Sequence, residues 1–238
     1  MTNREYIENE VLIIVPCYQE GERLNNLKES LKKFDAGFPY KLSVQVGKIA
    51  AIEHWLHAII ENDNYRYIIL MDDDVVIIQD NWLKDMIEVM TSNKYCGCVG
   101  VQIRRKDMSI DHCGVWLEPV CYPDTVGLKC KVINEKYNPD DRDIHSTYKV
   151  WQVAGCCALY DRQTFGMPPI RLYPRHGGWT DCGLQAQIWG NGFNVHYCGK
   201  VKVIHDTLTD AEKEKLYDGK PAMVSNNMMT YARMWNVI

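Results

Sequence analysis

Three consecutive aspartates, Asp72, Asp73 and Asp74, directly follow the apolar run YIILM at residues 67–71. The run is short, rich in isoleucine and free of proline and glycine, which is typical of a buried strand in a sheet. Carboxylates at the end of such a strand cannot enter an apolar core without a partner. Mg²⁺ and Mn²⁺ prefer oxygen ligands and often share them with substrate phosphates. The sequence therefore predicts a divalent cation, and through it a diphosphate, at the carboxyl end of this strand.

A solvated turn is the alternative interpretation of the same three residues, since aspartate is common in turns. Apolar residues resume at once, however, in the run VVII at residues 75–78. A surface turn would more often continue into polar residues or glycine, so the pattern favours the metal site.

The length and composition suit one α/β domain with a substantial core. The chain has 238 residues, of which 46% are hydrophobic, and a formal net charge of −4. This charge argues against bulk binding of nucleic acid. The local basic cluster at residues 104–106 is either a phosphate contact or a solvated loop.

No stretch of the sequence is long and apolar enough to span a membrane. The first ten residues are too polar for a secretory signal. The 10 cysteines follow no standard zinc-binding spacing. We therefore expect reduced thiols that pack as small apolar side chains, and a cytoplasmic location.

The first ninety residues alternate between strand patterns and helix patterns. An apolar run at residues 11–15 is closed by Pro16, and apolar residues then recur at helical spacing from Leu24 to Phe34. Further strands are expected at 40–46 and 67–71. A second helix is expected to start at 47–48, and a third to run over 82–90 with Asp80 or Asn81 as its cap.

The pattern becomes less regular from residue 96 onward. Strands are expected at 98–103, at 150–160 with Gly155 inside, and at 194–204 as one or two pieces. A helix is expected at 181–189, and residues 209–238 have the pattern of a helical tail. Together these elements predict a single α/β domain over residues 1–238.

Three motifs, in this order, resemble those of the family-2 nucleotide-sugar glycosyltransferases, which have a GT-A fold. The first is VLIIVPCYQE at 11–20, and the second is IILMDDD at 68–74. The third combines VAGCCAL at 153–159, GWTDCGL at 178–184 and VIH at 203–205. The resemblance covers about residues 10–206. It implies a Rossmann-like mixed sheet flanked by helices, a nucleotide-binding half at 10–95, an acceptor-binding half at 96–206 and a helical tail at 207–238.

The resemblance also implies site residues. Asp74 would bind a metal that bridges the diphosphate, His205 would reach the same metal or the diphosphate, and Asp181 would be the general base. The positions that would contact the donor nucleotide or its phosphates are Pro16, Tyr18, Glu20, Lys48, Asp72 and Asp73.

The implied activity is metal-dependent transfer of a sugar, with inversion, from a nucleoside diphosphate donor to an acceptor hydroxyl. The implied cofactor is Mn²⁺ or Mg²⁺, and a UDP-sugar is the expected donor. A base removes the proton of the acceptor hydroxyl, and a cation neutralises the diphosphate leaving group. The acceptor remains open among glycans, lipids, proteins and modified nucleic-acid bases.

The chain departs from the family pattern at two places. Thr180, Gly183 and Gln187 stand where the family has two acidic residues and an arginine. Near residues 36–48 one βα segment is missing, together with the aspartate that reads the nucleotide base. A sugar-nucleotide-binding protein without turnover is therefore the alternative. Residues 15–18 do not form the glycine-rich loop of a nucleotidyltransferase or a dinucleotide-dependent oxidoreductase.

Overall fold

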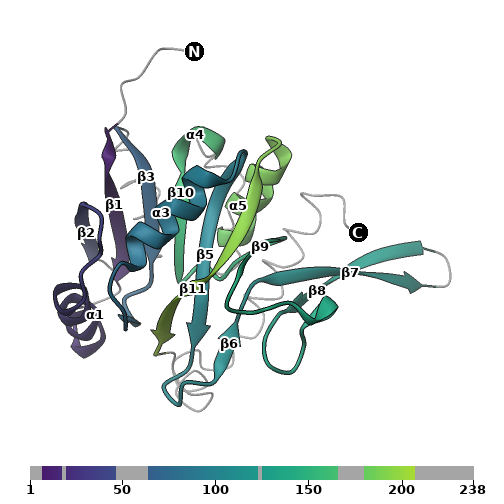
Figure 1. Cartoon of the computed structure of the whole chain (residues 1–238), viewed down its shortest axis with the longest axis horizontal. Coiled ribbons are helices and arrows are strands. Elements are labelled where there is room, and N and C mark those ends of the chain that lie inside the picture. The colour runs from purple at the N-terminus through teal and green to yellow at the C-terminus, as the bar shows by residue number, and fades with distance from the viewer. Residues whose placement is uncertain (1–6, 18–19, 47–63, 123–124, 166–179, 207–238) are drawn as a thin grey trace.

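The computed structural model describes residues 7–17, 20–46, 64–122, 125–165 and 180–206, and their centre is one mixed sheet (Figure 1). The strand order is β2-β1-β3-β10-β5-β11-β4. The bounds of these strands, in chain order, are β1 Ile7–Cys17, β2 Tyr40–Val46, β3 Tyr65–Met71, β4 Val75–Ile77, β5 Cys96–Arg104, β10 Cys157–Asp161 and β11 Asn194–His205.

Strand directions bring several carboxyl ends to the same edge of the sheet. β1 is parallel to β2 and β3, and β5 is parallel to β11. β10 lies between β3 and β5 and is antiparallel to both, so β3 and β5 run in the same direction. Cys17, Met71 and His205 therefore end their strands at one edge, where loops can carry functional side chains.

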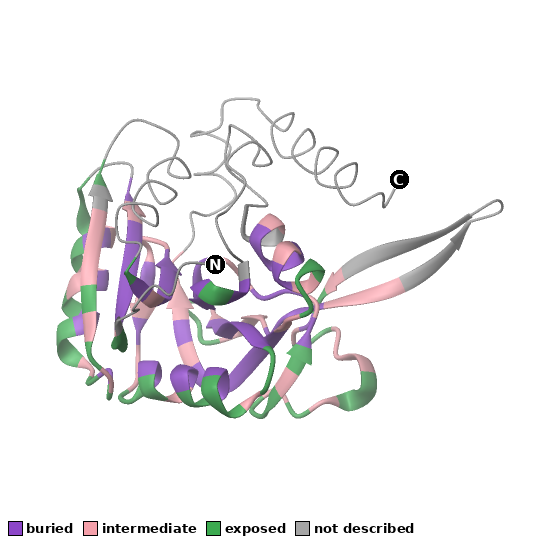
Figure 2. Cartoon of the chain, turned by 90° about the horizontal axis from the view of Figure 1, so that it is seen from above, coloured by how far each residue is buried: buried purple, intermediate pink, exposed green. Residues whose placement is uncertain are grey.

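Alternation along β1 explains how the sheet is buried on both faces. Val11 and Ile13 belong to one apolar cluster, and Leu12 and Ile14 belong to a second cluster. Successive side chains of a strand point to opposite faces, so a continuous apolar run needs cover on both sides. Figure 2 shows the buried residues concentrated along the sheet between its layers of helices.

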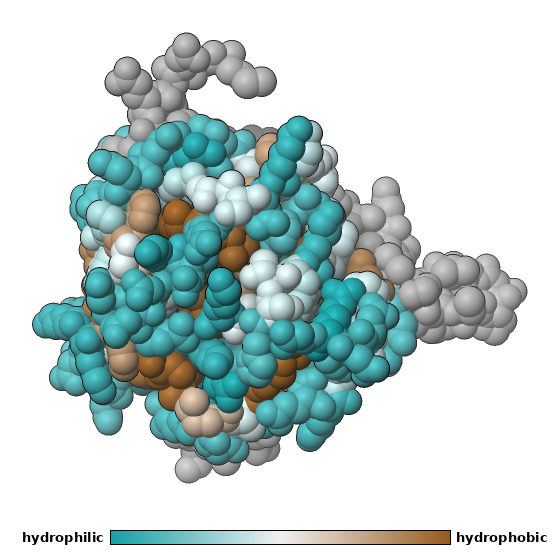
Figure 3. All heavy atoms as spheres, viewed as in Figure 1, coloured by the Kyte–Doolittle hydropathy of each residue, from teal (hydrophilic) through white to brown (hydrophobic). Residues whose placement is uncertain are grey.

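Four helices of the described chain provide that cover. α1 (Glu22–Lys33) and α3 (Trp82–Ser92) pack on the first cluster, while α5 (Thr180–Gly190) packs on the second. α4 (Arg162–Phe165) is a single turn that continues from β10. The face that carries α1 and α3 is mostly hydrophilic on its outside (Figure 3).

The predicted cap of α3 was right in position and wrong in chemistry. Asn81 occupies the N-cap position, but it has a left-handed backbone (φ 56°) and makes no side-chain cap bond. The carboxylate of Asp80 instead accepts a hydrogen bond from the Asp35 N–H at 2.8 Å. The loop after α1 is thus tied to the start of α3.

The strand predicted over residues 150–160 was wrong, because two strands share this stretch. β9 (Thr147–Val150) pairs with β11, whereas β10 begins only at Cys157 and pairs with β3 and β5. Gly155 lies between them. The side chain of Gln185 accepts from the Val153 N–H at 2.7 Å and donates to the Val153 carbonyl at 3.1 Å. These bonds satisfy backbone groups that no strand pairs here.

The structure confirms most of the other predicted elements. The runs at 11–15, 40–46, 67–71 and 98–103 lie in β1, β2, β3 and β5, and residues 194–204 form one strand. The helices predicted at 24–34, 82–90 and 181–189 correspond to α1, α3 and α5. The helix expected to start at 47–48 and the tail at 209–238 lie outside the described residues. The βα segment predicted to be missing near residues 36–48 is tested only in part, because residues 36–46 form the loop after α1 and β2, and residues 47–48 lie outside the described chain.

A β-hairpin and short elements within residues 107–150 were not predicted. The hairpin joins β7 (Val115–Tyr122) to β8 (Thr125–Val132) and projects away from the main sheet (Figures 1 and 2). The hairpin could have been predicted from the sequence, because two runs rich in strand-forming residues flank a pair of turn-forming residues at 123–124. The remaining elements are β6 (Ile110–His112) and the 3₁₀ turn Pro139–Asp141.

Cysteines in the described chain are packed as the sequence predicts. Those free and buried are Cys17, Cys96, Cys98, Cys113, Cys156, Cys157 and Cys198. Burial raises the pKa of the Cys96 thiol to about 12, which keeps that thiol protonated. None of the helices in this part of the chain has the length and apolar character needed to cross a membrane.

We expect Gly100→Ala to destabilise the protein by about 2 kcal/mol, because it overpacks a filled core. A Cβ at this position in β5 would lie 2.2 Å from the Val153 Cβ. Gly21→Ala is the matched control, since a Cβ there would meet no atom within 4 Å. Urea unfolding of both variants measures the difference, and equal stabilities would contradict this account of the packing.

Candidate functional site

The three aspartates form a tight turn between β3 and β4 at the carboxyl edge of the sheet. The Val75 N–H donates to the Asp72 carbonyl at 3.3 Å and closes the turn, and the Asp72 N–H donates to the Cys156 carbonyl at 2.9 Å. All three aspartates are partly buried. The residues therefore form a turn, as the alternative interpretation expects, but this turn is partly buried and not fully solvated.

Strand register brings His205 to this turn from the far end of the chain. β11 pairs with β4 so that His205 lies opposite Val75, the residue after Asp74. The Asp206 N–H then donates to the Asp74 carbonyl at 2.8 Å. Backbone pairing thus fixes the separation of the histidine and the aspartate before any ligand binds.

Asp72, Asp74 and His205 present one ligand atom each within 4.8 Å of one another. The His205 Nε2 lies 3.1 Å from Asp74 Oδ1 and 3.7 Å from Asp72 Oδ2. Neighbouring ligands at about 2.1 Å from an octahedral ion lie about 3 Å apart, so these spacings suit a single small cation.

Asp74 is the residue of the cluster whose surroundings best fit a cation. Its Oδ1 is buried without a well-oriented hydrogen-bond donor, and the His205 Nε2 lies 3.1 Å from it. A buried carboxylate oxygen without a donor costs free energy, and a metal ion would remove that cost. The carboxylate ligands suit Mg²⁺ and Mn²⁺, while an imidazole ligand also suits transition metals such as Zn²⁺ and Fe²⁺.

The electrostatics of His205 reflect the same crowding. Burial alone would lower the pKa of its imidazole, but the carboxylates of Asp74, Asp72 and Asp111 raise it, and the net effect is a raised pKa. A proton on this histidine offsets part of the local negative charge. A metal ligand must give up that proton, so metal and proton compete for the Nε2 atom.

Asp73 points to a different partner from its two neighbours. The Cys17 thiol at the end of β1 donates to the Asp73 Oδ2 at 2.9 Å. The structure therefore places Asp73 toward β1 and outside the metal cluster. This contact ties the ends of β1 and β3 together.

Sequence reasoning missed Arg23 and Asp206 as neighbours of the site. The Arg23 Nη1, on the first turn of α1, lies 3.9 Å from Asp74 Oδ2. The Lys106 Nζ lies 2.7 Å from Asp206 Oδ1, so part of the predicted basic cluster reaches this edge as an ion pair. The signal for Arg23 was its place in the first turn of the helix that follows the first strand.

The other predicted site residues are placed only in part. Pro16 is partly buried and pairs in register with Gln45 of β2, while Glu20 is exposed just before α1. Asp181 lies in the first turn of α5 by its backbone. α5 ends next to the start of β11 and packs along it, so its first turn lies toward the carboxyl edge. Tyr18 and Lys48 fall outside the described residues.

His112 gives a prediction about stability in acid. Burial lowers the pKa of its imidazole to about 4, with Asp111 raising it and His205 lowering it, and its Nδ1 accepts the Gly114 N–H at 3.0 Å. The folded pKa lies below the usual 6.5, so the histidine contributes stability above pH 6.5 that is lost as the pH falls toward 4. Because the residue retains some solvent exposure, we expect a loss of about 2 kcal/mol.

The variant His112→Asn keeps an acceptor near the position of Nδ1 and cannot be protonated. Unfolding by urea at pH 7 and at pH 4.5, with EDTA present, compares it with the wild type. The wild type should lose more stability on acidification than the variant, and an equal loss in both would contradict the assignment.

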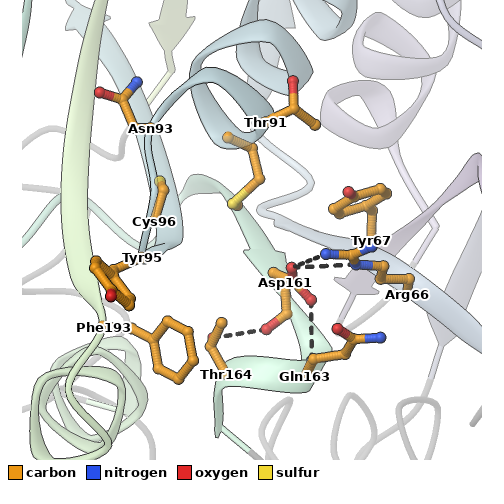
Figure 4. A pocket seen from close by; sticks show the side chains of 11 residues that line it. Arg66, Tyr67, Thr91, Asn93, Tyr95, Cys96, Asp161, Gln163, Thr164 and Phe193 are labelled. Atoms are coloured by element: carbon orange, nitrogen blue, oxygen red, sulfur yellow. Dashed lines mark hydrogen bonds and ion pairs between the residues drawn. The ribbon is translucent and has the colours of Figure 1, made fainter.

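A hollow lined by residues at the opposite edge of the sheet is separate from the candidate site, and Figure 4 shows it from close by. Its volume is about 320 Å³, and its walls include Arg66 at the start of β3 and Asp161 at the end of β10. Two hydrogen bonds of 3.0 and 3.2 Å join the Arg66 guanidinium to Asp161 Oδ2. Both charges are already matched, so we assign this hollow a structural role.

The strand order, the strand directions and the acidic turn at the carboxyl edge define a GT-A, Rossmann-like fold of the glycosyltransferase type. Among solved structures, the chain is similar to GalNAc-T7, crystallised with UDP, GalNAc and Mn²⁺, with a TM-score of 0.63 and 12% identity. That match covers 93% of this chain and 48% of GalNAc-T7, so the chain spans about half the length of that protein.

A second similar structure is A197 from STIV, with a TM-score of 0.50 and 12% identity. The match covers 84% of this chain and 86% of A197. The sequence matches no protein-family model and no curated protein. Identities this low establish the fold alone, so membership of glycosyltransferase family 2 stays a prediction.

Proposed function

We propose that this protein is a metal-dependent glycosyltransferase that transfers a sugar from a nucleoside diphosphate donor to an acceptor hydroxyl. The observation that carries the proposal is the cluster of Asp72, Asp74 and His205 at the carboxyl edge of a GT-A sheet. The similar GalNAc-T7 structure, which contains UDP and Mn²⁺, supports a UDP-sugar as the donor and Mn²⁺ as the metal.

The proposed metal ligands are Asp74 and His205, with Asp72 beside them. The buried, unsatisfied oxygen of Asp74 and the spacing of the three side chains fit a divalent ion. When bound, the ion would supply positive charge that offsets the charge developing on the diphosphate. These proposed roles are supported by the carboxylate oxygens and the imidazole nitrogen that lie close together at the ends of the strands.

The remaining donor contacts are proposed from their positions along the carboxyl edge. Residues 10–95 would hold the nucleotide, with Pro16, Tyr18 and Glu20 next to the end of β1. Lys48 would favour a phosphate, and Asp73 would hold the turn in place through its bond with Cys17. Residues 96–206 would supply the acceptor side.

Asp181 is the proposed general base. A carboxylate at a helix start interacts favourably with the helix dipole. It would take the proton of the acceptor hydroxyl while the hydroxyl oxygen attacks the anomeric carbon from the side opposite the leaving diphosphate. Direct displacement of this kind inverts the anomeric configuration, which NMR of the product can measure.

The proposal is tested by incubating the pure protein with Mn²⁺ and a panel of nucleotide sugars, with candidate acceptors added, and assaying release of nucleoside diphosphate. We expect release that depends on Mn²⁺ and stops with EDTA. Donor binding without release under every acceptor would favour the alternative, a sugar-nucleotide-binding protein without turnover. If the protein neither binds a donor nor releases nucleoside diphosphate, the proposal is overturned.

Asp181→Asn should lower turnover by at least about 100-fold and leave donor affinity within about threefold, because it removes the base and keeps the side-chain volume. Initial rates and calorimetric titration with UDP measure the two effects separately. Glu88→Gln, at an exposed position on α3, is the matched control for replacing a carboxylate by an amide. A variant with normal turnover would exclude Asp181 as the base.

A further inference from the structure

Arg23 differs from the other cations at the carboxyl edge because its guanidinium N–H groups make no hydrogen bond within the described chain. Its Nη1 lies 3.9 Å from Asp74 Oδ2, which is close enough for attraction and too far for a hydrogen bond. The side chain is 37% exposed. In the described chain, this guanidinium has no hydrogen-bonded partner, so its N–H donors are available to a ligand.

Within the described residues, three other cations near this edge are already engaged. Arg104 donates to the Gln102 side chain at 2.8 Å and to the Met108 carbonyl. Arg105 donates to Asp111 at 2.7 Å, and Lys106 forms its 2.7 Å pair with Asp206. A ligand would have to compete with these contacts, whereas Arg23 would gain hydrogen bonds that it lacks.

Charge balance explains why a cation is needed beside the turn. The three aspartates of the turn outweigh a divalent ion by one negative charge, and the diphosphate of a nucleotide sugar brings two more. At separations of 4 to 6 Å, an uncompensated excess of this kind weakens the binding of a diphosphate. Arg23 stands close enough to Asp74 to offset part of it.

We propose that Arg23 binds the diphosphate of the donor, as a phosphate-contacting residue supplied by the first turn of α1. A guanidinium can donate two parallel hydrogen bonds to phosphate oxygens, and its planar fork matches their geometry better than an ammonium does. This inference rests on the proposed function, and it adds a residue that the sequence motifs do not include.

The test uses the full chain and two titrations, Mn²⁺ alone and UDP in the presence of saturating Mn²⁺, with GDP as a second probe. Arg23→Ala should weaken UDP binding about tenfold. The same variant should bind Mn²⁺ alone as tightly as the wild type or up to about threefold more tightly, because a repelling charge next to Asp74 is gone. Arg23→Lys should lose about threefold in UDP affinity.

Lys32→Ala is the matched control, since Lys32 is an exposed cation in the last turn of the same helix. It should change neither affinity. Circular dichroism checks that each variant is folded. If Arg23→Ala does not fold, the UDP affinity of Arg23→Lys tests the proposal.

Weaker UDP binding together with unchanged or tighter Mn²⁺ binding supports the inference. If the wild type binds both ligands and Arg23→Ala keeps its UDP affinity, this inference is overturned and the proposed function stands. If Arg23→Ala weakens both ligands equally, Arg23 acts through Asp74 and does not contact the phosphates. A wild type that binds Mn²⁺ and no nucleoside diphosphate overturns the proposed function, and this inference with it.

Discussion

Asp74→Asn is expected to weaken Mn²⁺ binding by about 100-fold, equivalent to about 2.7 kcal/mol. The reason is that Asp74 is the most buried carboxylate of the cluster, with a side chain 14% exposed against 49% for Asp72. A desolvated carboxylate gains most from a cation, and an amide replaces its charge with a dipole. Calorimetry or the electron paramagnetic resonance signal of free Mn²⁺ measures the affinity.

Asp73→Asn is the matched control for this experiment, because it makes the same change one residue away. Asp73 accepts the Cys17 thiol and lies outside the cluster, so its variant should keep Mn²⁺ affinity within about threefold, a difference of about 0.7 kcal/mol. In EDTA, Asp74→Asn should unfold within about 1 kcal/mol of the wild type, since it removes a buried charge that accepts no hydrogen bond there. Equal losses of affinity in the two variants would disprove the assignment of the ligands.

Arg66→Met is expected to destabilise the fold by about 3 kcal/mol, because it leaves the Asp161 carboxylate buried without its partner. The Asp161 side chain is 8% exposed, and two hydrogen bonds from Arg66 satisfy its Oδ2. Arg66 also donates to Glu8 of β1 at 2.8 Å. Burial would lower the pKa of Arg66, but the pairing with Asp161 and Glu8 raises it above its usual value. Urea unfolding measures the loss.

Two further variants separate the buried pair from ordinary surface charge. The double variant Arg66→Met with Asp161→Asn should recover most of the stability, since no buried charge is then left alone. Arg105→Met breaks an exposed pair with Asp111 and should cost less than about 1 kcal/mol. A double variant no more stable than Arg66→Met alone would contradict the buried-charge explanation.

Local patterns in the sequence predicted the strands that fill the middle of the sheet. Residues 11–15 and 67–71 read as continuous apolar runs because both faces of β1 and β3 are covered, so every side chain in them must be apolar. The acidic triplet was recognisable for a related reason, since three charges adjoining such a run need a partner. His205 was found through its motif at the end of a strand.

Long-range pairing decided what local patterns left open. Residues 150–160 looked like one strand because they are mostly apolar, yet β9 and β10 pair with different neighbours. The short strands β6 and β9 have mixed composition, because they lie at the margin of the sheet. Such strands lack the alternation or continuity that marks a strand in isolation.

The sequence by itself determined which residues carry charge at the strand ends, because an apolar run fixes where a chain must be buried and where it can leave the core. The family resemblance implied that Asp74 and His205 share one metal, but only the tertiary structure decided the 3.1 Å contact between them and the approach of Arg23. These two partners of Asp74 lie 131 residues later and 51 residues earlier in the chain. Those meetings depend on the pairing of β11 with β4 and on the packing of α1, and neither is encoded in the spacing of residues along one segment.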